Sequence, residues 1–226
     1  IAQRFRRFAP AGFDHVSLRV VEEHSHTTRV RQDVAEPSDR SLDRGAMVTV
    51  ISGTGIGYAA TCDLSDTGLR AAVERAGEWA RLSRGRSVFD VAPKLPQARG
   101  RYVSPTVRPL ALSTADRLDL LMRESRACRI DERVVDWEAS LWTVRSLQET
   151  VDLDGGQTRQ EYDFTIPALH VVAHRDGLTQ TRSWGGRYNG YCQQGGMEVI
   201  ERSGFVGSGR ATAEEALQLL EAPNCP

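Results

Sequence analysis

Alternating apolar and polar residues, typical of half-buried strands, open the ordered pattern of the chain. The alternation runs over residues 16–22 and returns over residues 28–34, so it predicts two strands joined as a hairpin. An apolar run over 46–51, a glycine-rich stretch and a second apolar run over 56–61 predict another hairpin. The first part of the chain is therefore expected to form an antiparallel sheet.

Three segments show helical periodicity or helix-start signals. The first helix should start at Asp63 or Ser65, end near Gly85 and bury one face, made of Leu69, Ala72, Val73, Ala76, Trp79 and Ala80. A second helix should start at Ser113, where Asp116 three residues later completes a capping box. A last helix is indicated by Thr212 with Glu215. Between the first two helices, four prolines within 86–109 predict an extended connector.

Strand patterns then return over 134–143, 144–153, 161–173 and 178–184, with turns at 154–156 and 176–177. The order of hairpins, glycine-rich turn and helix thus occurs twice, which indicates a duplication of modules 13–85 and 130–200 linked by 86–129. The alternative is that any antiparallel sheet shows this rhythm. The expected fold class is α+β, with antiparallel or mixed sheets built from repeated β-hairpins and packed helices.

Composition excludes some classes of function. The 226 residues carry 29 basic and 30 acidic side chains, a net charge of −1, which argues against generic nucleic-acid binding. No apolar stretch is long enough to predict a membrane span. The four cysteines lie far apart without a CxxC pair, so a reduced, cytosolic chain is expected, although an even count leaves a disulfide open.

The histidines do not predict a metal site, and nothing in the sequence assembles a catalytic set. His170 and His174 have the spacing of two zinc ligands on a helix, but their neighbours predict a strand and no HExxH glutamate is present. His24 and His26 are expected in a surface turn. No GxSxG elbow or Cys–His pairing indicates a nucleophile.

The glycine-rich run 184–196 combines aromatic rings, amides and one guanidinium, the composition of a cleft that binds an extended peptide. Its candidate substrate-cleft residues are Trp184, Arg187, Tyr188 and Tyr191. The alternative, an irregular connector, stays open because composition alone does not separate the two.

Several stretches share the pattern of one protein family. Residues 43–45, Asp-Arg-Gly, lead into a Val-rich strand, the return strand over 57–65 reads GYAATCDLS, and an amphipathic helix follows from Leu69. The run 184–199 and the terminal Ala-Pro-Asn-Cys-Pro continue the pattern. Together these stretches resemble the N-terminal domain of the TldD/PmbA family, called modulators of DNA gyrase and regarded as metallopeptidases.

Members of that family are about twice as long, and their HExxxH zinc motif follows the segment where this chain ends. The chain contains no HExxxH, so the resemblance assigns it, over 1–226, the N-terminal domain alone, without the C-terminal zinc peptidase domain. No catalytic or metal-binding residue is assigned to it, and zinc is expected to bind outside it.

The resemblance implies a function for the complete protein, a cytoplasmic zinc metallopeptidase that hydrolyses peptides or partly unfolded polypeptides. This chain should form part of the substrate cleft and of a homodimer or a TldD/PmbA-type heterodimer. No nucleic acid and no membrane are expected as partners. The alternative is a non-catalytic interaction module of the gyrase-modulator type.

Overall fold

The computed structural model describes residues 2–8, 12–88, 98–186 and 190–223, which contain both strands and helices. The strands are β1 (His15–Arg31), β2 (Val34–Ala35), β3 (Asp39–Ser52), β4 (Gly55–Thr61), β5 (Arg99–Val103), β6 (Val134–Asp152), β7 (Gln157–Arg175), β8 (Leu178–Trp184) and β9 (Gln193–Gln194). The helices are α1 (Ala2–Phe8), α2 (Asp66–Leu82), α3 (Thr114–Cys128), α4 (Met197–Ser203) and α5 (Ser208–Glu221).

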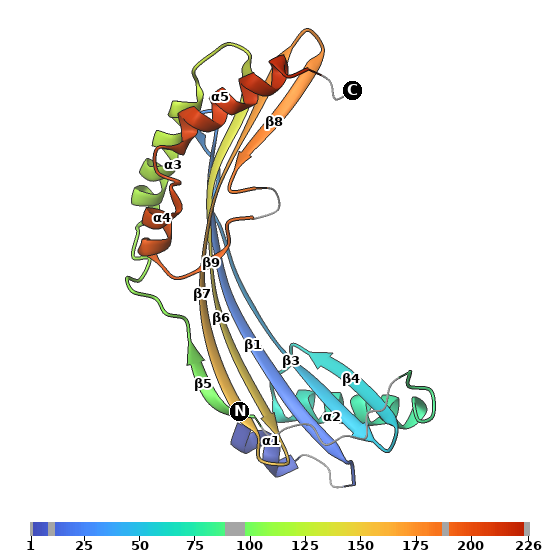
Figure 1. Ribbon diagram of the computed structural model, residues 1–226. Helices are drawn as coiled ribbons and strands as arrows, with labels where there is room; N and C mark the ends of the chain where they lie inside the picture. Colours follow the sequence, from blue (N-terminus) through green and yellow to red (C-terminus); the bar gives the residue numbers. More distant parts are fainter. Residues whose placement is uncertain (1, 9–11, 89–97, 187–189, 224–226) are drawn as a thin grey trace. The chain divides into compact units, whose positions relative to one another are not determined.

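The strands of these described residues form one nine-stranded sheet with the order β4-β3-β1-β6-β7-β5 (Figure 1). Strand β2 pairs with β1, while β8 and β9 pair with β7. The pairs β3–β4 and β7–β8 are antiparallel, whereas β5 and β7 run parallel. The predicted α+β class is confirmed. No helix of the described segments is long and apolar enough to cross a membrane.

The chain divides into two compact units. Unit 1 comprises residues 1–23, 42–103 and 146–161, and unit 2 comprises residues 24–41, 104–145 and 162–226. Strands β1, β3, β6 and β7 contribute residues to both units. The predicted duplication of modules 13–85 and 130–200 stays a prediction.

Unit 1 packs α2 against β4, as the predicted hairpin and helix require (Figure 1). The hairpin turns at Gly53, whose φ of 60° suits glycine, and pairs Val48 of β3 with Ala59 of β4. Helix α2 begins after Ser65, whose hydroxyl accepts the backbone N–H of Gly68 at 3.1 Å. The core of unit 1 also contains residues of α1 and the sheet: Phe5, Val16, Leu18, Val50 and Val151.

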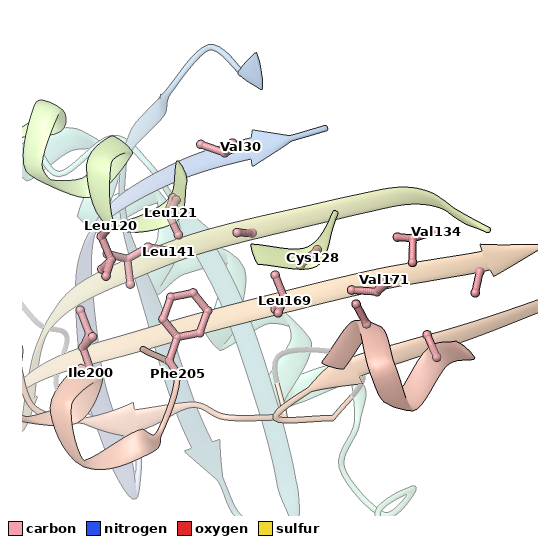
Figure 2. Packing of buried hydrophobic residues seen from close by; sticks show 14 of the residues in the cluster. Val30, Leu120, Leu121, Cys128, Val134, Leu141, Leu169, Val171, Ile200 and Phe205 are labelled. Carbon is pink, nitrogen blue, oxygen red and sulfur yellow. The ribbon is translucent and has the colours of Figure 1, made fainter. Parts of the chain in front are cut away.

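Unit 2 places α3, α4 and α5 on one face of its strands (Figure 1). Figure 2 shows the apolar core between them, in which Leu121, Leu141, Leu169 and Phe205 are fully buried. The predicted capping box of α3 is confirmed, because the Ser113 hydroxyl accepts the N–H of Asp116 and the Asp116 carboxylate accepts the N–H of Ser113.

Three predictions of local structure are wrong. The expected hairpin over 16–34 is one continuous strand, β1, and the chain reverses at Gln32 and Asp33, both with positive φ. Polar side chains in the middle of β1 find partners on β6: the Trp142 indole N–H donates to Ser25 Oγ at 2.6 Å. His24 and His26 belong to this continuous strand, so the surface turn expected for them is not present. Residues 134–153, expected as two strands, likewise form the single strand β6.

Helix ends and connectors show two further differences. The last helix starts at Ser208, four residues before the expected cap Thr212, whose hydroxyl instead donates to the carbonyl of Ser208 at 2.9 Å. The proline-rich connector contains strand β5, which pairs with β7. An edge position in the sheet explains how a segment without apolar alternation becomes a strand.

Trp79, expected on the buried face of α2, is 56% exposed, whereas Leu69, Ala72, Ala76 and Ala80 are buried. Trp79 lies between the buried Ala76 and Ala80 in sequence, but on the helix it falls at the border of the buried face. Trp79→Ala is therefore expected to lower the free energy of unfolding by about 1 kcal/mol or less. The exposed Arg75→Ala should have an equally small effect in the same denaturant titration. A loss for Trp79→Ala several times larger than for Arg75→Ala would contradict the exposed position.

Candidate functional site

A pocket of about 700 Å³ in unit 2 brings together charged, polar and apolar side chains. It lies where β1, β6 and β7 meet the start of α3 and the loop that follows β5. The residues that line it are His24, Ser25, His26, Arg40, Thr106, Pro109, Leu110, Arg117, Thr143, Val144, Arg145, Asp163, Phe164, Thr165, Gly195 and Gly196. Its volume is in the range of small-ligand sites.

Arg117, in the first part of α3, is the most unusual residue of this pocket because it is only 5% exposed. Both terminal nitrogens of its guanidinium donate to the same acceptor, Thr143 Oγ1, at 3.3 Å. Its Nε has no hydrogen-bond partner. Among the described residues no carboxylate forms an ion pair with it. Burial, and then the charge of Arg40, lower the pKa of Arg117.

The acidic side chains near Arg117 are committed to other partners. Asp116, its neighbour in sequence, accepts the hydroxyl and the N–H of Ser113 in the capping box. Asp163, which also lines the pocket, lies 4.0 Å from Arg145 and accepts a long hydrogen bond from Thr106. The described lining residues include three arginines, at 40, 117 and 145, and one aspartate, so the pocket carries an excess of positive charge. That charge also acts on His26, whose pKa is lowered by burial and by the arginines at 117 and 40.

The glycine side of the pocket is held by Glu198 of α4. Its carboxylate accepts the backbone N–H groups of Gly196, Val107 and Arg108 at 3.0 to 3.1 Å. Although partial burial raises the pKa of Glu198, these N–H donors lower it to about 2. Gly196 is required there, because a Cβ would lie 2.0 Å from the carbonyl oxygen of Arg108. The loop after β5 is thus fixed against the start of α4.

Of the predicted cleft residues, the two that the structure describes, Trp184 and Tyr191, do not line this pocket. Trp184, at the end of β8, stacks edge-on against the buried Phe205 and packs against Tyr191, with ring centroids 5.3 and 5.2 Å apart. Arg187 and Tyr188 lie outside the described residues. Of the glycine-rich run, Gly195 and Gly196 reach the pocket. That the four named residues form a substrate cleft stays a prediction.

Zinc, which the family resemblance implies for the complete protein, does not fit the described residues of this chain. They contain no group of three or more His, Cys, Asp or Glu side chains placed to hold a metal. His170 and His174 lie on β7, and four residues along a strand span about 13 Å, too far for one zinc ion. His174 Nδ1 instead lies 2.9 Å from Thr179 Oγ1.

The purified 226-residue chain is accordingly expected to retain no stoichiometric zinc after loading and dialysis. Elemental analysis of the dialysed protein measures this directly, with His174→Ala as the matched variant. One zinc per chain in the wild type and none in His174→Ala would contradict this expectation and identify His174 as a ligand.

Comparison with known proteins gives a partial sequence match and an extensive match in fold. The family model for PmbA/TldA metallopeptidase domain 1 matches residues 16–80. No curated protein sequence matches the chain significantly. Among solved structures, a protein described as a modulator of DNA gyrase from Bacteroides thetaiotaomicron matches with a TM-score of 0.72 and 13% identity. That match covers 96% of this chain and 48% of the solved one.

Two other solved structures agree. A protein from Thermotoga maritima, also described as a modulator of a DNA gyrase, has a TM-score of 0.62 and 17% identity, covering 94% of this chain and 46% of its own. TldE from Thermococcus kodakarensis has a TM-score of 0.63 and 15% identity, covering 97% and 47%. At these identities the matches show a shared fold, and this chain spans about half the length of each solved protein.

Proposed function

The predicted resemblance to the N-terminal domain of the TldD/PmbA family is confirmed, and from this premise we propose that the chain is the cleft-forming part of a TldD-like zinc metallopeptidase. The observation that carries the proposal is that the shared fold covers nearly the whole chain but only about half of each solved protein. The substrates of the complete protein would be peptides or partly unfolded polypeptides.

In this proposal the chain binds and positions the peptide, while residues outside it hold zinc and carry out hydrolysis. The unit 2 pocket supports a binding role, because charged Arg117 and Arg40 lie in it together with apolar Leu110 and Phe164. Such a mixture suits an extended polypeptide, which presents both polar and apolar groups. No catalytic residue is assigned to the chain itself.

We further propose a cytoplasmic protein that acts as a homodimer or a TldD/PmbA-type heterodimer, without nucleic acid or membrane as partners. Cys62, Cys128 and Cys192 are free thiols, which supports a reducing compartment. Burial raises the pKa of Cys128 to about 12, so this thiol is unreactive at neutral pH. The near-zero net charge argues against binding to a phosphate backbone.

The second candidate is a non-catalytic interaction module, favoured by the two solved proteins described as modulators of DNA gyrase. The polypeptide that the gene encodes beyond Pro226 separates the two candidates. An HExxxH motif there, in a native protein of about twice this length, would support the peptidase. A complete protein without any metal-binding motif would favour the interaction module.

A further inference from the structure

We infer that the unit 2 pocket binds a carboxylate group of a peptide through the guanidinium of Arg117, with Arg40 as a second positive charge. The inference deepens the proposed function by naming the chemistry of the substrate that this chain recognises. The carboxylate can be the C-terminus of the peptide or an acidic side chain, and both present the same pair of oxygens.

The unused hydrogen-bonding capacity of Arg117 carries the inference. A guanidinium has five N–H donors, and the two bonds to Thr143 Oγ1 are both 3.3 Å long and share one acceptor. Nε has no partner, although the side chain is nine-tenths buried. Buried charges in proteins are normally paired, because an unpaired one is costly in free energy. A ligand carboxylate would supply the missing charge and accept two parallel N–H bonds.

The positive charge of Arg117 is available to a ligand, because no carboxylate of the described residues forms an ion pair with it. Asp116, next to Arg117 in sequence, is held by Ser113, and Asp163, which lines the same pocket, is held by Arg145 and Thr106. Arg40 donates to Thr114 Oγ1 at 3.3 Å, at the start of the same helix, so it adds positive charge beside Arg117. Among the described lining residues the positive charges thus outnumber the single carboxylate, Asp163, and that carboxylate is not paired with Arg117.

The lining indicates a peptide and not a simple anion. Pro109, Leu110, Val144 and Phe164 line the same pocket as the arginines, so a ligand meets apolar surface next to the charge. A volume of about 700 Å³ is much larger than an inorganic anion needs and matches the size of sites for larger ligands. An apolar residue that carries or neighbours a carboxylate satisfies both parts of the pocket.

The test measures binding of short fluorescent peptides to the 226-residue chain. Four probes are compared: a peptide ending in leucine as the free acid, its C-terminal amide, the same amide with one internal glutamate, and inorganic phosphate as competitor. The chains are wild type, Arg117→Gln, Arg40→Gln and the control Arg123→Gln, an exposed arginine on the same helix α3 that does not line this pocket.

We expect the free acid to bind wild type at least tenfold more tightly than the amide, a difference of about 1.4 kcal/mol. Arg117→Gln should lower the affinity for the free acid at least tenfold, Arg40→Gln should lower it by a smaller factor, and Arg123→Gln should leave it unchanged. If the amide with internal glutamate binds as tightly as the acid, the inference stands with the side chain as the source of the carboxylate. Phosphate at millimolar concentration should not displace the peptide.

Thermal melting without ligand separates a binding role from a structural one. Because the buried Arg117 has no carboxylate to balance its charge, Arg117→Gln should melt at the same temperature as wild type or at a higher one. Equal binding of acid and amide, effective displacement by phosphate, or a lower melting temperature for Arg117→Gln with unchanged peptide affinity would overturn the inference. None of these results bears on zinc-dependent hydrolysis, which tests the proposed function separately.

Discussion

Gly57→Ala is expected to lower the free energy of unfolding by about 3 kcal/mol, because the added methyl group has no room between β4 and α2. A Cβ on Gly57 would lie 2.0 Å from the carbonyl oxygen of Ala76 and 2.5 Å from the backbone nitrogen of Ala80. These neighbours are helix backbone, which cannot move aside as a flexible side chain would. The helix must therefore shift away from the strand that it covers.

Gly100→Ala is the matched control, since Gly100 also lies in a strand, β5, but a Cβ there meets no atom within 4 Å. This substitution should leave stability unchanged or raise it slightly, because alanine has less conformational freedom in the unfolded chain. Denaturant unfolding of both variants, followed by circular dichroism, gives the comparison. Equal effects of the two substitutions would show that α2 does not approach β4 closely.

Glu124→Ala is expected to have an effect of similar size, about 3 kcal/mol, in unit 2. The Glu124 carboxylate is buried on α3 and accepts the backbone N–H groups of Gly207 and Gly209 at 2.8 and 3.0 Å. It thus caps α5, whose own N-cap residue offers no side chain. Alanine would leave the N–H of the buried Gly209 and that of the more exposed Gly207 without this acceptor, and it would remove a negative charge from the helix N-terminus.

Glu214→Ala, on α5 itself, is the control for this prediction. Glu214 forms an exposed pair with Arg210 one helical turn away, which contributes only about 0.3 to 0.5 kcal/mol. Denaturant midpoints and slopes for both variants show whether the carboxylate at 124 acts as a cap. A loss for Glu124→Ala no larger than that for Glu214→Ala would contradict the capping role.

The sequence predicts those elements whose signals are local. Ser65 and Ser113 start their helices as expected, because a hydroxyl that accepts an N–H two or three residues later depends only on neighbouring residues. The turns at Gly53 and at 176–177 are also confirmed, since positive φ favours glycine and aspartate. Local chemistry thus fixes the ends of many elements.

Elements that depend on distant partners differ from the predictions. The polar middle of β1 looked like a turn because its side chains are stabilised by β6, more than a hundred residues away in sequence. Helix α5 starts before the predicted Thr212 because its cap, Glu124, belongs to another helix. In both cases the deciding group lies elsewhere in the chain.

The candidate site was only partly visible in the sequence. The glycine-rich run pointed to the region, and its residues 195 and 196 do line the unit 2 pocket. Arg117, however, occupies a helical position where an arginine normally extends into solvent, and no local signal marks it as buried. Only the packing of α3 against β6 shows that Arg117 points inward.

Peptide hydrolysis by the complete protein, this chain together with the polypeptide that follows it, tests the central proposal most directly. The assay compares the complete protein with its C-terminal part alone, each with zinc, after chelation and after zinc is restored. We predict hydrolysis that stops on chelation, returns with zinc and falls at least tenfold when residues 1–226 are absent, because this chain positions the peptide. No hydrolysis by the zinc-loaded complete protein, or equal hydrolysis by the C-terminal part alone, would contradict the proposal.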